Sequence, residues 1–425
     1  MTLFIVAVIT LMAVLGAPIF IVISSFAMLG FYLADIPIAV IIVDIYNKFS
    51  NTPLLYTIPL FTFAGYILAE SKTSVRIVNF SRAVLGWLPG GLAIVSLAVC
   101  AFFTAFTGAS GVTIIALGGL LYPALIKEKY PEKFSLGLLT SSGSLGLLFP
   151  PSLPIILYGV VSGTSINQLF AAGLIPGILL ILLLSIYSIV TAKKQKAVKR
   201  RFSFKEVLKA TYETKWELLI PFIIIIGIYG GFVTLGEIAT ITIVYALFIE
   251  VFIYRDIRIT EIPDIMTRSM ILVGGILIIL GSAYGLTNYI VDARVPMVIL
   301  DFMKEYISSR FVFLIMLNVF LLVVGCVLDI YSALLVVVPL ILPIAISYNV
   351  NPVHLGIIFL TNLEIGYSTP PVGMNLFISC FRFKKPVTTL YRASIPFLII
   401  LFAGLMIITY VPELSLGLVE YFEIK

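Results

Sequence analysis

The sequence is poor in charged residues and in the side chains that build most catalytic and metal centres. Asp, Glu, Lys and Arg make up only 11% of its 425 residues, and it contains one histidine and three cysteines. The low charge excludes a soluble globular domain, because a domain of this length needs far more polar surface. The cysteines lie singly in apolar segments, so neither a disulfide framework nor a cysteine metal site is expected. One histidine is too few for a histidine-rich metal centre.

Long apolar runs are what the sequence has instead, since 61% of its residues are hydrophobic. A membrane-spanning helix needs roughly 20 apolar residues, and the runs predict an all-α polytopic membrane protein. The first half is expected to contain spans at 2–15, 18–34 and 54–70, a helical hairpin at 88–127, a broken span at 133–163 and a span at 167–191. The second half is expected to contain spans at 217–233, 236–254 and 268–290, a hairpin at 310–348, a broken span at 352–381 and a span at 387–411.

The helix breakers of the two halves recur at a fixed offset of 220 positions. Without any gap, this offset aligns Pro123 with Pro343, Gly146 with Gly366, Pro150-Pro151 with Pro370-Pro371, and Ile175-Pro176 with Ile395-Pro396. Such duplication predicts two repeats, at 1–192 and 217–425, that are joined by a linker at 193–216. The weak centre of each hairpin cannot lie in open lipid, so each hairpin is expected to be re-entrant. Each repeat then crosses the membrane five times, and the second repeat is inverted.

The distribution of charge predicts the orientation of the chain. If the basic run from Lys193 to Lys215 is cytoplasmic, 22 of the 27 Lys and Arg residues lie on that side, and both termini lie outside. This distribution follows the positive-inside rule of membrane proteins. Topology therefore explains the formal net charge of +6, and no nucleic-acid partner is expected.

The linker contains the start of a helix. Ser203 followed by Glu206 has the pattern of a capping box, and apolar residues then recur on one helical stripe up to Trp216. Together with the lysines of the linker, this pattern predicts an amphipathic helix at 203–216 that lies in the cytoplasmic interface of the bilayer. A solvated connector is the alternative interpretation.

Polar side chains and helix breakers coincide at four places within apolar segments, namely 107–113, 140–152, 325–332 and 361–375. Non-helical backbone at membrane depth is tolerated only where it is buried in protein or lines a cavity. Its free carbonyl groups are ligands for Na⁺, and the N-terminal ends of half-helices favour the carboxylate of a substrate. These features are typical of a secondary transporter whose site lies between two repeats.

The candidate ion and substrate ligands are the polar groups at these four places and the glycines and prolines beside them. In the first repeat they are Thr107, Gly108, Ser110, Gly143, Ser144, Gly146, Pro150, Pro151 and Ser152, with Thr113, Ser141 and Ser142 close by. In the second repeat they are Asp329, Ser332, Gly366, Thr369, Pro370 and Asn375, with Thr361, Asn362 and Gly373 close by. Asp329 stands out, because a carboxylate at a hairpin tip inside a membrane is costly unless it binds something.

Two questions about these candidates stay open on the sequence alone. The small residues among them also suit close packing of helices in a membrane, without any ligand. Glu364 lies just before the second break, where an ion-pair or network role and a ligand role are equally compatible with the sequence.

Four segments of the chain resemble the large membrane subunit of TRAP (tripartite ATP-independent periplasmic) transporters, and the likeness extends over nearly the whole chain. They are TGASG at 107–111, GSLGLLFPPS at 143–152, GCVLD at 325–329 and GYSTPPVGMN at 366–375. The resemblance implies an elevator-type carrier in the inner membrane of a bacterium, in which a mobile domain with both hairpins slides within a scaffold, driven by a Na⁺ gradient. It also implies two partners, a small four-helix membrane subunit and a periplasmic binding protein that delivers an organic acid.

By this resemblance, Na⁺ binds at two or more sites and no organic cofactor is needed. One Na⁺ site would lie near Ser110, Ser144 and Gly146, and another near Asp329, Gly366 and Thr369. At position 109 this chain has alanine where many relatives have serine, which leaves the division of ligands at the first tip open. The substrate is open as well, because sialic acid, C4-dicarboxylates and other organic acids would need similar ligands.

Other functions are weaker interpretations of the same residues. The sequence GASG at 108–111 matches a motif of rhomboid intramembrane proteases, but such a serine needs a histidine partner, and His354 is expected at the outer end of a span. We therefore predict that the chain is not an enzyme. A stand-alone Na⁺/dicarboxylate symporter of a related inverted-repeat fold is the main alternative, because the partners would be other chains. A passive scaffold or channel subunit would gain nothing from the duplicated breaks.

Overall fold

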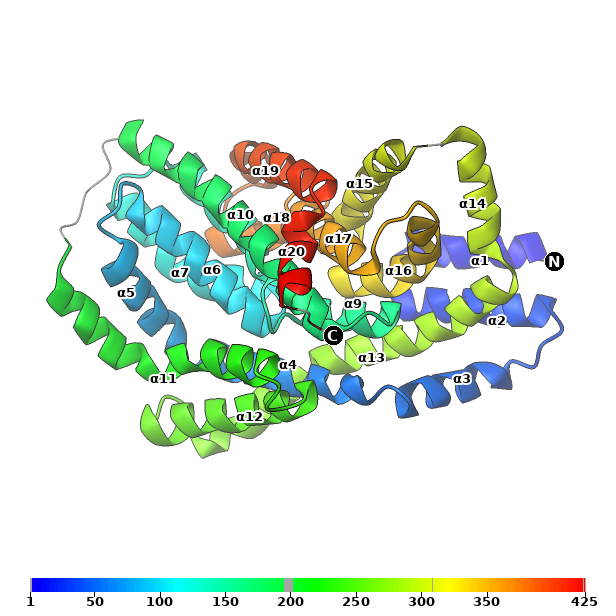
Figure 1. Cartoon of the computed structure of the whole chain (residues 1–425), viewed down its shortest axis with the longest axis horizontal. Coiled ribbons are helices and arrows are strands. Elements are labelled where there is room, and N and C mark those ends of the chain that lie inside the picture. The colour runs from blue at the N-terminus through cyan, green and yellow to red at the C-terminus, as the bar shows by residue number, and fades with distance from the viewer. Residues whose placement is uncertain (1, 195–201, 308, 423, 425) are drawn as a thin grey trace.

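The computed structural model describes residues 2–194, 202–307, 309–422 and 424, and every regular element in these ranges is a helix (Figure 1). Seven helices of this part of the chain are long and apolar enough to cross a membrane, or up to nine spans if each bent pair counts as one. The prediction of an all-α polytopic membrane protein is confirmed. The first helices are α1 (Thr2–Val14), α2 (Ile19–Leu33), α3 (Ala39–Ser50), η1 (Pro53–Tyr56), α4 (Thr57–Glu70) and α5 (Thr73–Leu85).

A series of helices then occurs twice, once in each half of the chain. The first series is α6 (Gly91–Thr107), α7 (Ser110–Lys127), α8 (Glu132–Ser142), η2 (Leu145–Leu148), α9 (Leu153–Ser162) and α10 (Ile166–Lys194). The second series is α15 (Arg310–Val327), α16 (Ile330–Ser347), α17 (Pro352–Gly366), α18 (Met374–Phe383) and α19 (Val387–Tyr410). Both bounds of α16 equal those of α7 plus 220 residues, so the offset of the sequence repeat is also the offset of the helices.

Helix breakers interrupt the spans at the predicted places. The two parts of the first broken span, Glu132–Leu148 and Leu153–Ser162, are bent by 46°. In the second repeat, the break between α17 and α18 covers residues 367–373. Both Pro-Pro bonds, Pro150-Pro151 and Pro370-Pro371, are cis. Because proline lacks an N–H donor and clashes with the preceding turn, neither segment continues as a helix, and polar backbone groups are left free at both breaks.

The remaining helices are α11 (Phe204–Tyr229), α12 (Leu235–Phe248), the π-helix η3 (Ile249–Ile253), η4 (Ile259–Glu261), α13 (Ile262–Asp292), α14 (Val295–Tyr306) and α20 (Glu413–Tyr421). Ser203 caps α11 by accepting a hydrogen bond from the backbone N–H of Glu206 at 3.4 Å, as the capping pattern predicts. The boundary expected between the linker helix at 203–216 and a span at 217–233 is wrong, because α11 is continuous. A buried stripe of Ala210, Thr214 and Glu217 crosses that position at helical spacing. Residues 195–201 of the linker lie outside the described residues.

The expected series of spans also omits α3, α5, α14 and α20. Helices α3 and α14 have 12 residues each, α5 has 13 and α20 has 9. Each is shorter than the roughly 20 residues of a full span, although α3 and α4 together form a bent pair that is long enough. Polar residues interrupt the apolar positions of these helices, so a search for long apolar runs does not find them. Helices α5 and α14 hold equivalent places in the two repeats, directly before α6 and α15.

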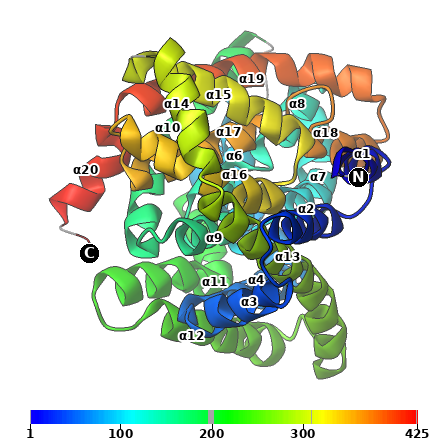
Figure 2. The ribbon, with the colours of Figure 1, turned by 90° about the vertical axis from the view of Figure 1, so that its right-hand side faces the viewer.

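The helices form two groups in space. Figures 1 and 2 show α3, α4, α11, α12 and α13 together along the lower side of the molecule, with the two repeated series of helices above them. Helix α2 packs along α13, and Ser24 Oγ donates a hydrogen bond to Ser282 Oγ at 2.9 Å. We call α2, α3, α4, α11, α12 and α13 the base layer. The base layer contains the spans that the sequence predicts to stay fixed during transport, 18–34 and 236–254.

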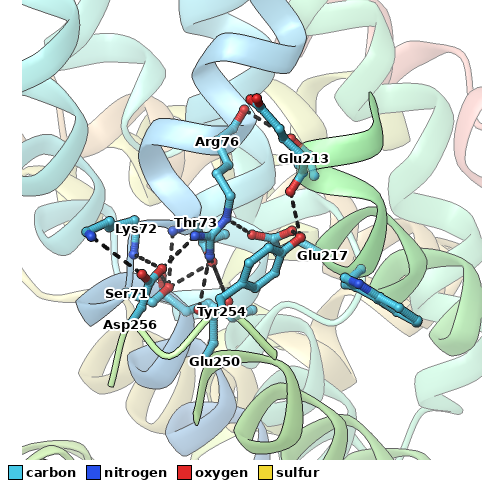
Figure 3. Close-up of polar contacts among 12 residues, drawn as sticks. Ser71, Lys72, Thr73, Arg76, Glu213, Glu217, Glu250, Tyr254 and Asp256 are labelled. Carbon is cyan, nitrogen blue, oxygen red and sulfur yellow. Dashed lines mark hydrogen bonds and ion pairs between the residues drawn. The ribbon is translucent and has the colours of Figure 1, made fainter. Parts of the chain in front are cut away.

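A buried cluster of charges joins α5 to the base layer (Figure 3). The guanidinium group of Arg76 contacts Glu217 on α11, Glu250 on η3 at 3.0 Å and Asp256 at 2.6 Å. Only 14% of the Arg76 side chain is exposed, and both glutamates are fully buried. The planar guanidinium donates in several directions at once, so one arginine holds three carboxylates from separate segments.

Further contacts complete this cluster. Thr73 Oγ1 donates a hydrogen bond to Glu250 at 2.8 Å, and the hydroxyl of Tyr254 donates to Glu217 at 2.6 Å (Figure 3). The guanidinium carbon of Arg76 lies 3.8 Å from the centre of the Tyr254 ring, in a cation–π contact. We call Thr73, Arg76, Glu217, Glu250, Tyr254 and Asp256 the Arg76 cluster. Its residues come from the segments predicted to lie at or next to the cytoplasmic side.

A second contact joins loops that are also predicted to be cytoplasmic. Lys385 Nζ, in the loop after α18, lies 2.5 Å from Glu132 at the start of α8. The hydrogen bond to Glu132 raises the pKa of Lys385. Both contacts agree with the predicted topology, in which 71–87, 127–133, 254–268 and 382–392 share one side.

The most deeply buried helices are the first parts of the two broken spans. Every residue of α8 from Phe134 to Ser142 and every residue of α17 from Val353 to Gly366 is buried. Both helices end directly before a break, so each break begins in the core of the molecule, although the second break reaches the surface at Pro371 and Val372.

Candidate functional site

The first hairpin tip is the turn between α6 and α7. Gly108 has a φ of +65°, and a Cβ atom at this position would lie 2.7 Å from Cβ of Leu153. Only glycine fits both the left-handed backbone and the close approach of α9. The turn ends at Ser110, the first residue of α7, and no acidic residue lies in the first turn of that helix. The N-terminal end of α7 is therefore open to a negative partner.

The first tip contacts the second repeat directly. Ser110 Oγ donates a hydrogen bond to Oδ1 of Asn375, at the start of α18, at 2.7 Å. The hydroxyl of Tyr331, in the first turn of α16, donates to the carbonyl oxygen of Gly108 at 2.8 Å. The side-chain amide of Asn375 also contacts Thr140 O and Ser144 Oγ, both at 3.4 Å. Four sequence-predicted residues, Gly108, Ser110, Ser144 and Asn375, thus meet in one polar cluster built from both repeats.

The two broken spans cross at the centre of this cluster. Ser144 Oγ donates a hydrogen bond to the carbonyl oxygen of Glu364 at 3.2 Å, and these two residues are equivalent positions of the repeats. Ser368 Oγ contacts Thr140 O at 3.4 Å. Four residues later on the second segment, the contact therefore lies four residues earlier on the first. The two segments are therefore antiparallel. Equivalent residues of two inverted repeats meet only on their pseudo-two-fold axis, which places Ser144 and Glu364 on that axis.

Glycines at equivalent positions let each break approach its own hairpin. A Cβ atom at Gly146 would lie 2.2 Å from Ala101 O and 2.4 Å from Ala105 N on α6. A Cβ atom at Gly366 would lie 2.7 Å from Cα of Gly325 on α15. Residues 105 and 325 are themselves equivalent, so both repeats use the same backbone contact. Packing therefore explains these two glycines, whether or not their carbonyl groups bind an ion.

The second hairpin tip is organised by Asp329, which is the N-cap of α16. Its Oδ2 accepts hydrogen bonds from the backbone N–H groups of Tyr331 and Ser332 at 3.0 and 3.1 Å, and its Oδ1 accepts from the Ser332 hydroxyl. This capping role is absent from the sequence prediction, which treats Asp329 only as an ion ligand. The side chain is partly exposed and keeps lone pairs that these donors do not use.

Several other predicted site residues bond within their own helices. Thr107 Oγ1 donates to Phe103 O at 3.0 Å and Thr369 Oγ1 to Ile365 O at 2.8 Å. Such bonds are a common structural use of threonine in helices. A Cβ atom at Gly143 would lie 2.6 Å from Cγ1 of Ile114, which again indicates close packing.

Buried hydroxyl groups without a partner mark the first break. Ser141 and Ser152 are fully buried, and within the described residues their Oγ atoms have no hydrogen-bond partner. Ser152 is the N-cap residue of α9 but makes no capping bond. Buried polar groups are usually paired, so the free oxygens fit a site that takes an oxygen-bound cation such as Na⁺. Among the described residues, no group of three His, Cys, Asp or Glu residues forms a site for other metals.

The pair of residues that a rhomboid-like protease needs is not assembled. Ser110 Oγ donates to Asn375, and the His354 ring nitrogens lie 3.2 Å from Ser415 Oγ and from Thr409 O. His354 is buried in the first turn of α17, where it joins α19 and α20.

Sequence reasoning missed several residues that join the tips and the breaks. The list of candidates omits Thr140, Tyr331 and Tyr367, although Tyr367 contacts the backbone N–H of Ile330 at the second tip. Thr104 is also missing, and its Oγ1 donates to Gly143 O at 2.6 Å. A tyrosine two residues after a tip aspartate was a usable signal. The Thr104 contact was not, because threonine is common inside membrane helices.

A family model described as "Tripartite ATP-independent periplasmic transporter, DctM component" matches residues 3–414. The chain belongs to this DctM transporter family. Membership confirms the resemblance drawn from the four motifs, and it implies a tripartite system with a small membrane subunit and a substrate-binding protein. This DctM-family chain is a multi-span membrane transport protein.

Individual relatives cover most of the DctM-family chain. It is 35% identical over 366 residues to the C4-dicarboxylate TRAP transporter large permease protein DctM of Pseudomonas aeruginosa, over 86% of each chain. It is 34% identical to the protein of that name from Vibrio cholerae, over 95% of this chain and 94% of the other. It is 32% identical to the ectoine/5-hydroxyectoine TRAP transporter large permease protein UehC of Ruegeria pomeroyi, over 86% and 85%.

Two solved transporter structures share its fold. The YdaH transporter of Alcanivorax borkumensis has a TM-score of 0.65 at 11% identity, over 88% of each chain. MtrF of Neisseria gonorrhoeae has a TM-score of 0.58 at 13% identity, over 88% of this chain and 85% of the other. At these identities the likeness shows the fold alone.

Proposed function

We propose that this chain is the large membrane subunit of a Na⁺-driven carrier that imports an organic acid delivered by a periplasmic binding protein. The observation that carries the proposal is the polar cluster in which the first tip meets the second break. Ser110, Ser144 and Asn375 come from different parts of both repeats, yet they converge among fully buried hydroxyl groups and free backbone. An oxygen-rich centre of this kind suits Na⁺.

The ends of three helices supply the complementary preference for an anion. Helices α7, α9 and α18 begin at a tip or a break, and none has an acidic residue at its N-cap or in its first turn, whereas the carboxylate of Asp329 already caps α16. Helix N-termini attract carboxylates. Na⁺ bound to the hydroxyl and carbonyl oxygens would add positive charge beside the substrate, so cation and anion stabilise each other in the site.

The relatives suggest the substrate class. Their names refer to C4-dicarboxylates, isethionate and ectoine. These compounds share an acidic group, a carboxylate or a sulfonate, so we infer an organic acid as the substrate, with a C4-dicarboxylate as the first compound to test and sialic acid, which the family resemblance also suggests, as the second. The tripartite family supports a small four-helix membrane subunit and the periplasmic binding protein as partners.

The membrane arrangement proposed here follows from charge and repeat symmetry. The chain lies in the bacterial inner membrane with both termini in the periplasm. The two repeated series of helices form the mobile domain, and the base layer stays fixed. Alternating access results when each repeat adopts the shape that its inverted twin had before.

The proposal is tested by Ser110→Ala in proteoliposomes that contain the binding protein and the small subunit. Loss of one cation ligand is expected to reduce Na⁺-driven uptake at least about tenfold, which corresponds to ~1.4 kcal/mol. Ser188→Ala is the matched control, because this buried serine donates only to Leu184 O of its own helix α10 at 2.8 Å. Unchanged uptake and Na⁺ dependence in the Ser110 variant would contradict the assignment.

A stand-alone Na⁺/dicarboxylate symporter is the second candidate. This chain shares its fold with the YdaH transporter, but the fold alone does not distinguish the two candidates. Full uptake by the purified chain alone would support it. Co-purification of a small membrane subunit, and uptake that requires the binding protein, would support the tripartite carrier.

A further inference from the structure

A small cavity lies between the base layer and helices α9 and α16. Lys48 on α3 and Thr287 and Asn288 on α13 form its base-layer wall, and Val161 on α9 and Leu335 on α16 lie opposite. Its volume is about 90 Å³. A water molecule needs about 10–15 Å³ of such space, so a carboxylate group fits. Leu335 lies five residues, or about 8 Å, after the start of α16 at the second tip, so the cavity is near the proposed transport site but outside it.

The lysine of this cavity has an equivalent residue in the second repeat. The offset of 220 positions aligns Asp44 with Asp264 and Lys48 with Arg268, so each repeat has an aspartate and a cation four positions later. In the proposed orientation, Lys48 lies on the periplasmic side and Arg268 on the cytoplasmic side, because the repeats are inverted. The base layer therefore has one cation of this kind near each membrane surface.

The two equivalent cations differ in how their charge is compensated. Arg268 pairs with Asp264 at 2.9 Å and with Glu70 at 2.8 Å. Lys48 has no ion pair among the described residues, and its ammonium group lies 5.9 Å from the centre of the Tyr284 ring. The cation near the cytoplasmic surface is thus neutralised by two carboxylates, whereas the cation near the periplasmic surface keeps its charge for another partner.

Asp44, the equivalent of the aspartate that pairs with Arg268, is bonded to a different group. Asp44 Oδ2 accepts a hydrogen bond from Asn288 Nδ2 at 2.6 Å. The second N–H of that amide remains, on the same wall of the cavity as the Thr287 hydroxyl and the ammonium group of Lys48. Among the described residues, no Asp or Glu lines the cavity. The wall therefore offers an anion three kinds of donor and no opposing carboxylate.

We infer that this cavity is an anion subsite at the periplasmic mouth of the transport path, where Lys48 holds a carboxylate of the substrate before it reaches the second tip. The inference rests on the proposed function for the identity of the anion, an organic acid. The ammonium group binds the carboxylate by charge-assisted hydrogen bonds. Asp44, one helical turn away, keeps the net charge of the wall low, so the anion is held weakly and can move on. At the cytoplasmic surface, where the substrate must leave, the equivalent Arg268 is already paired and does not retain it.

Thr287→Cys, in a full-length background without the native cysteines, provides a chemical probe of the cavity. The purified protein in phosphatidylcholine nanodiscs is treated with an anionic or a cationic methanethiosulfonate reagent, and the two reaction rates are compared. Lys48→Gln is expected to slow the anionic reagent and accelerate the cationic one, which lowers the ratio of the rates at least about threefold. Opposite changes of this kind cannot result from lost access to the cysteine. Lys48→Arg is expected to keep the ratio, as is the matched control Lys304→Gln, which removes an exposed lysine on α14.

Succinate then tests the class of ligand. At constant ionic strength, it is expected to protect the introduced cysteine when Lys48 or its arginine replacement is present, and not in Lys48→Gln. An unchanged ratio in Lys48→Gln, or protection that is absent or independent of Lys48, would overturn the inference. Protection by phosphatidylglycerol in the nanodisc but not by succinate would assign Lys48 to a lipid headgroup and would also overturn it. The labelling needs neither a Na⁺ gradient nor a binding protein, so a failure of organic-acid uptake would contradict the proposed function and leave the labelling result standing.

Discussion

At the scale of single residues, Asp329 combines two roles that substitutions can separate. Three donors of the first turn of α16 converge on its carboxylate, which fixes the start of that helix. A carboxylate has about four lone-pair directions, so a cation can still approach from the open side of the tip. Asparagine caps a helix about as well as aspartate does, but it is uncharged.

Asp329→Asn is expected to raise the Na⁺ concentration for half-maximal uptake at least about tenfold, with little change in thermal stability. Asp329→Ala removes the cap as well and is expected to cost about 1 kcal/mol more, which lowers the apparent melting temperature. Na⁺ titrations of uptake and thermal melting of the purified variants separate the two effects.

Ser309→Ala is the control for these variants. Ser309 caps α15 through the N–H of Phe311 at 3.2 Å but brings no negative charge, so its loss should leave the Na⁺ dependence unchanged. A normal Na⁺ dependence in Asp329→Asn would reduce Asp329 to a helix cap.

At the scale of helices, the Arg76 cluster fixes the position of α5 relative to the base layer. Helix α5 leads from α4 of the base layer to α6 of the first hairpin, and the cluster holds it to α11 and η3 (Figure 3). The equivalent helix α14 has no ion pair among the described residues. The two inverted repeats therefore differ: ion pairs hold the helix before the first hairpin, α5, to the base layer, but not the helix before the second hairpin, α14.

Arg76→Ala is expected to destabilise the protein by about 3–5 kcal/mol, because it leaves Glu217 and Glu250 buried without a countercharge. Arg268→Ala is the matched control, since Arg268 pairs with Glu70 at 2.8 Å on the surface, with side chains 47% and 40% exposed. Such a pair contributes about 0–1 kcal/mol. Denaturation of both variants in mixed micelles compares them, and equal stability of Arg76→Ala and wild type would show that the cluster does not hold α5.

Sequence patterns located the hairpins and breaks because proline, glycine and long apolar runs have local effects. Helices α5 and α14 escaped this reasoning, since a short amphipathic helix has neither a long apolar run nor a helix breaker. The capping role of Asp329 was readable from the rule that aspartate starts helices. The contact between Ser110 and Asn375 was not, because it joins residues 265 positions apart and depends on how two repeats fold together.

At the scale of the whole molecule, the base layer and the repeated helices meet along α4 and α6. Gly65 on α4 touches the first tip, where a Cβ atom would lie 2.2 Å from Phe106 O. Leu68 on α4 and Phe102 on α6 lie beside this contact, among others. If the hairpins slide past a fixed base layer, this contact must break in each cycle.

A cysteine pair at Leu68 and Phe102, joined by a short cross-linker in a background without the native cysteines, is expected to stop uptake. Its formation should vary with Na⁺, because ion binding favours one conformation. A pair at Ser24 and Ser282 is the control: these residues touch within the base layer, and their cross-link should leave uptake intact. Full uptake with Leu68 and Phe102 linked would contradict the sliding motion.

The contact between Ser110 and Asn375 has a consequence for the synthesis of the protein at the ribosome. The chain is made from its N-terminus at roughly 5–20 residues per second, so Asn375 follows Ser110 by roughly 10–50 s. Throughout that interval, the first hairpin is in the membrane without the amide that its serine binds in the finished molecule. The first repeat is therefore an unfinished half during biogenesis, and its polar core depends on the insertion machinery or on water until the second repeat arrives.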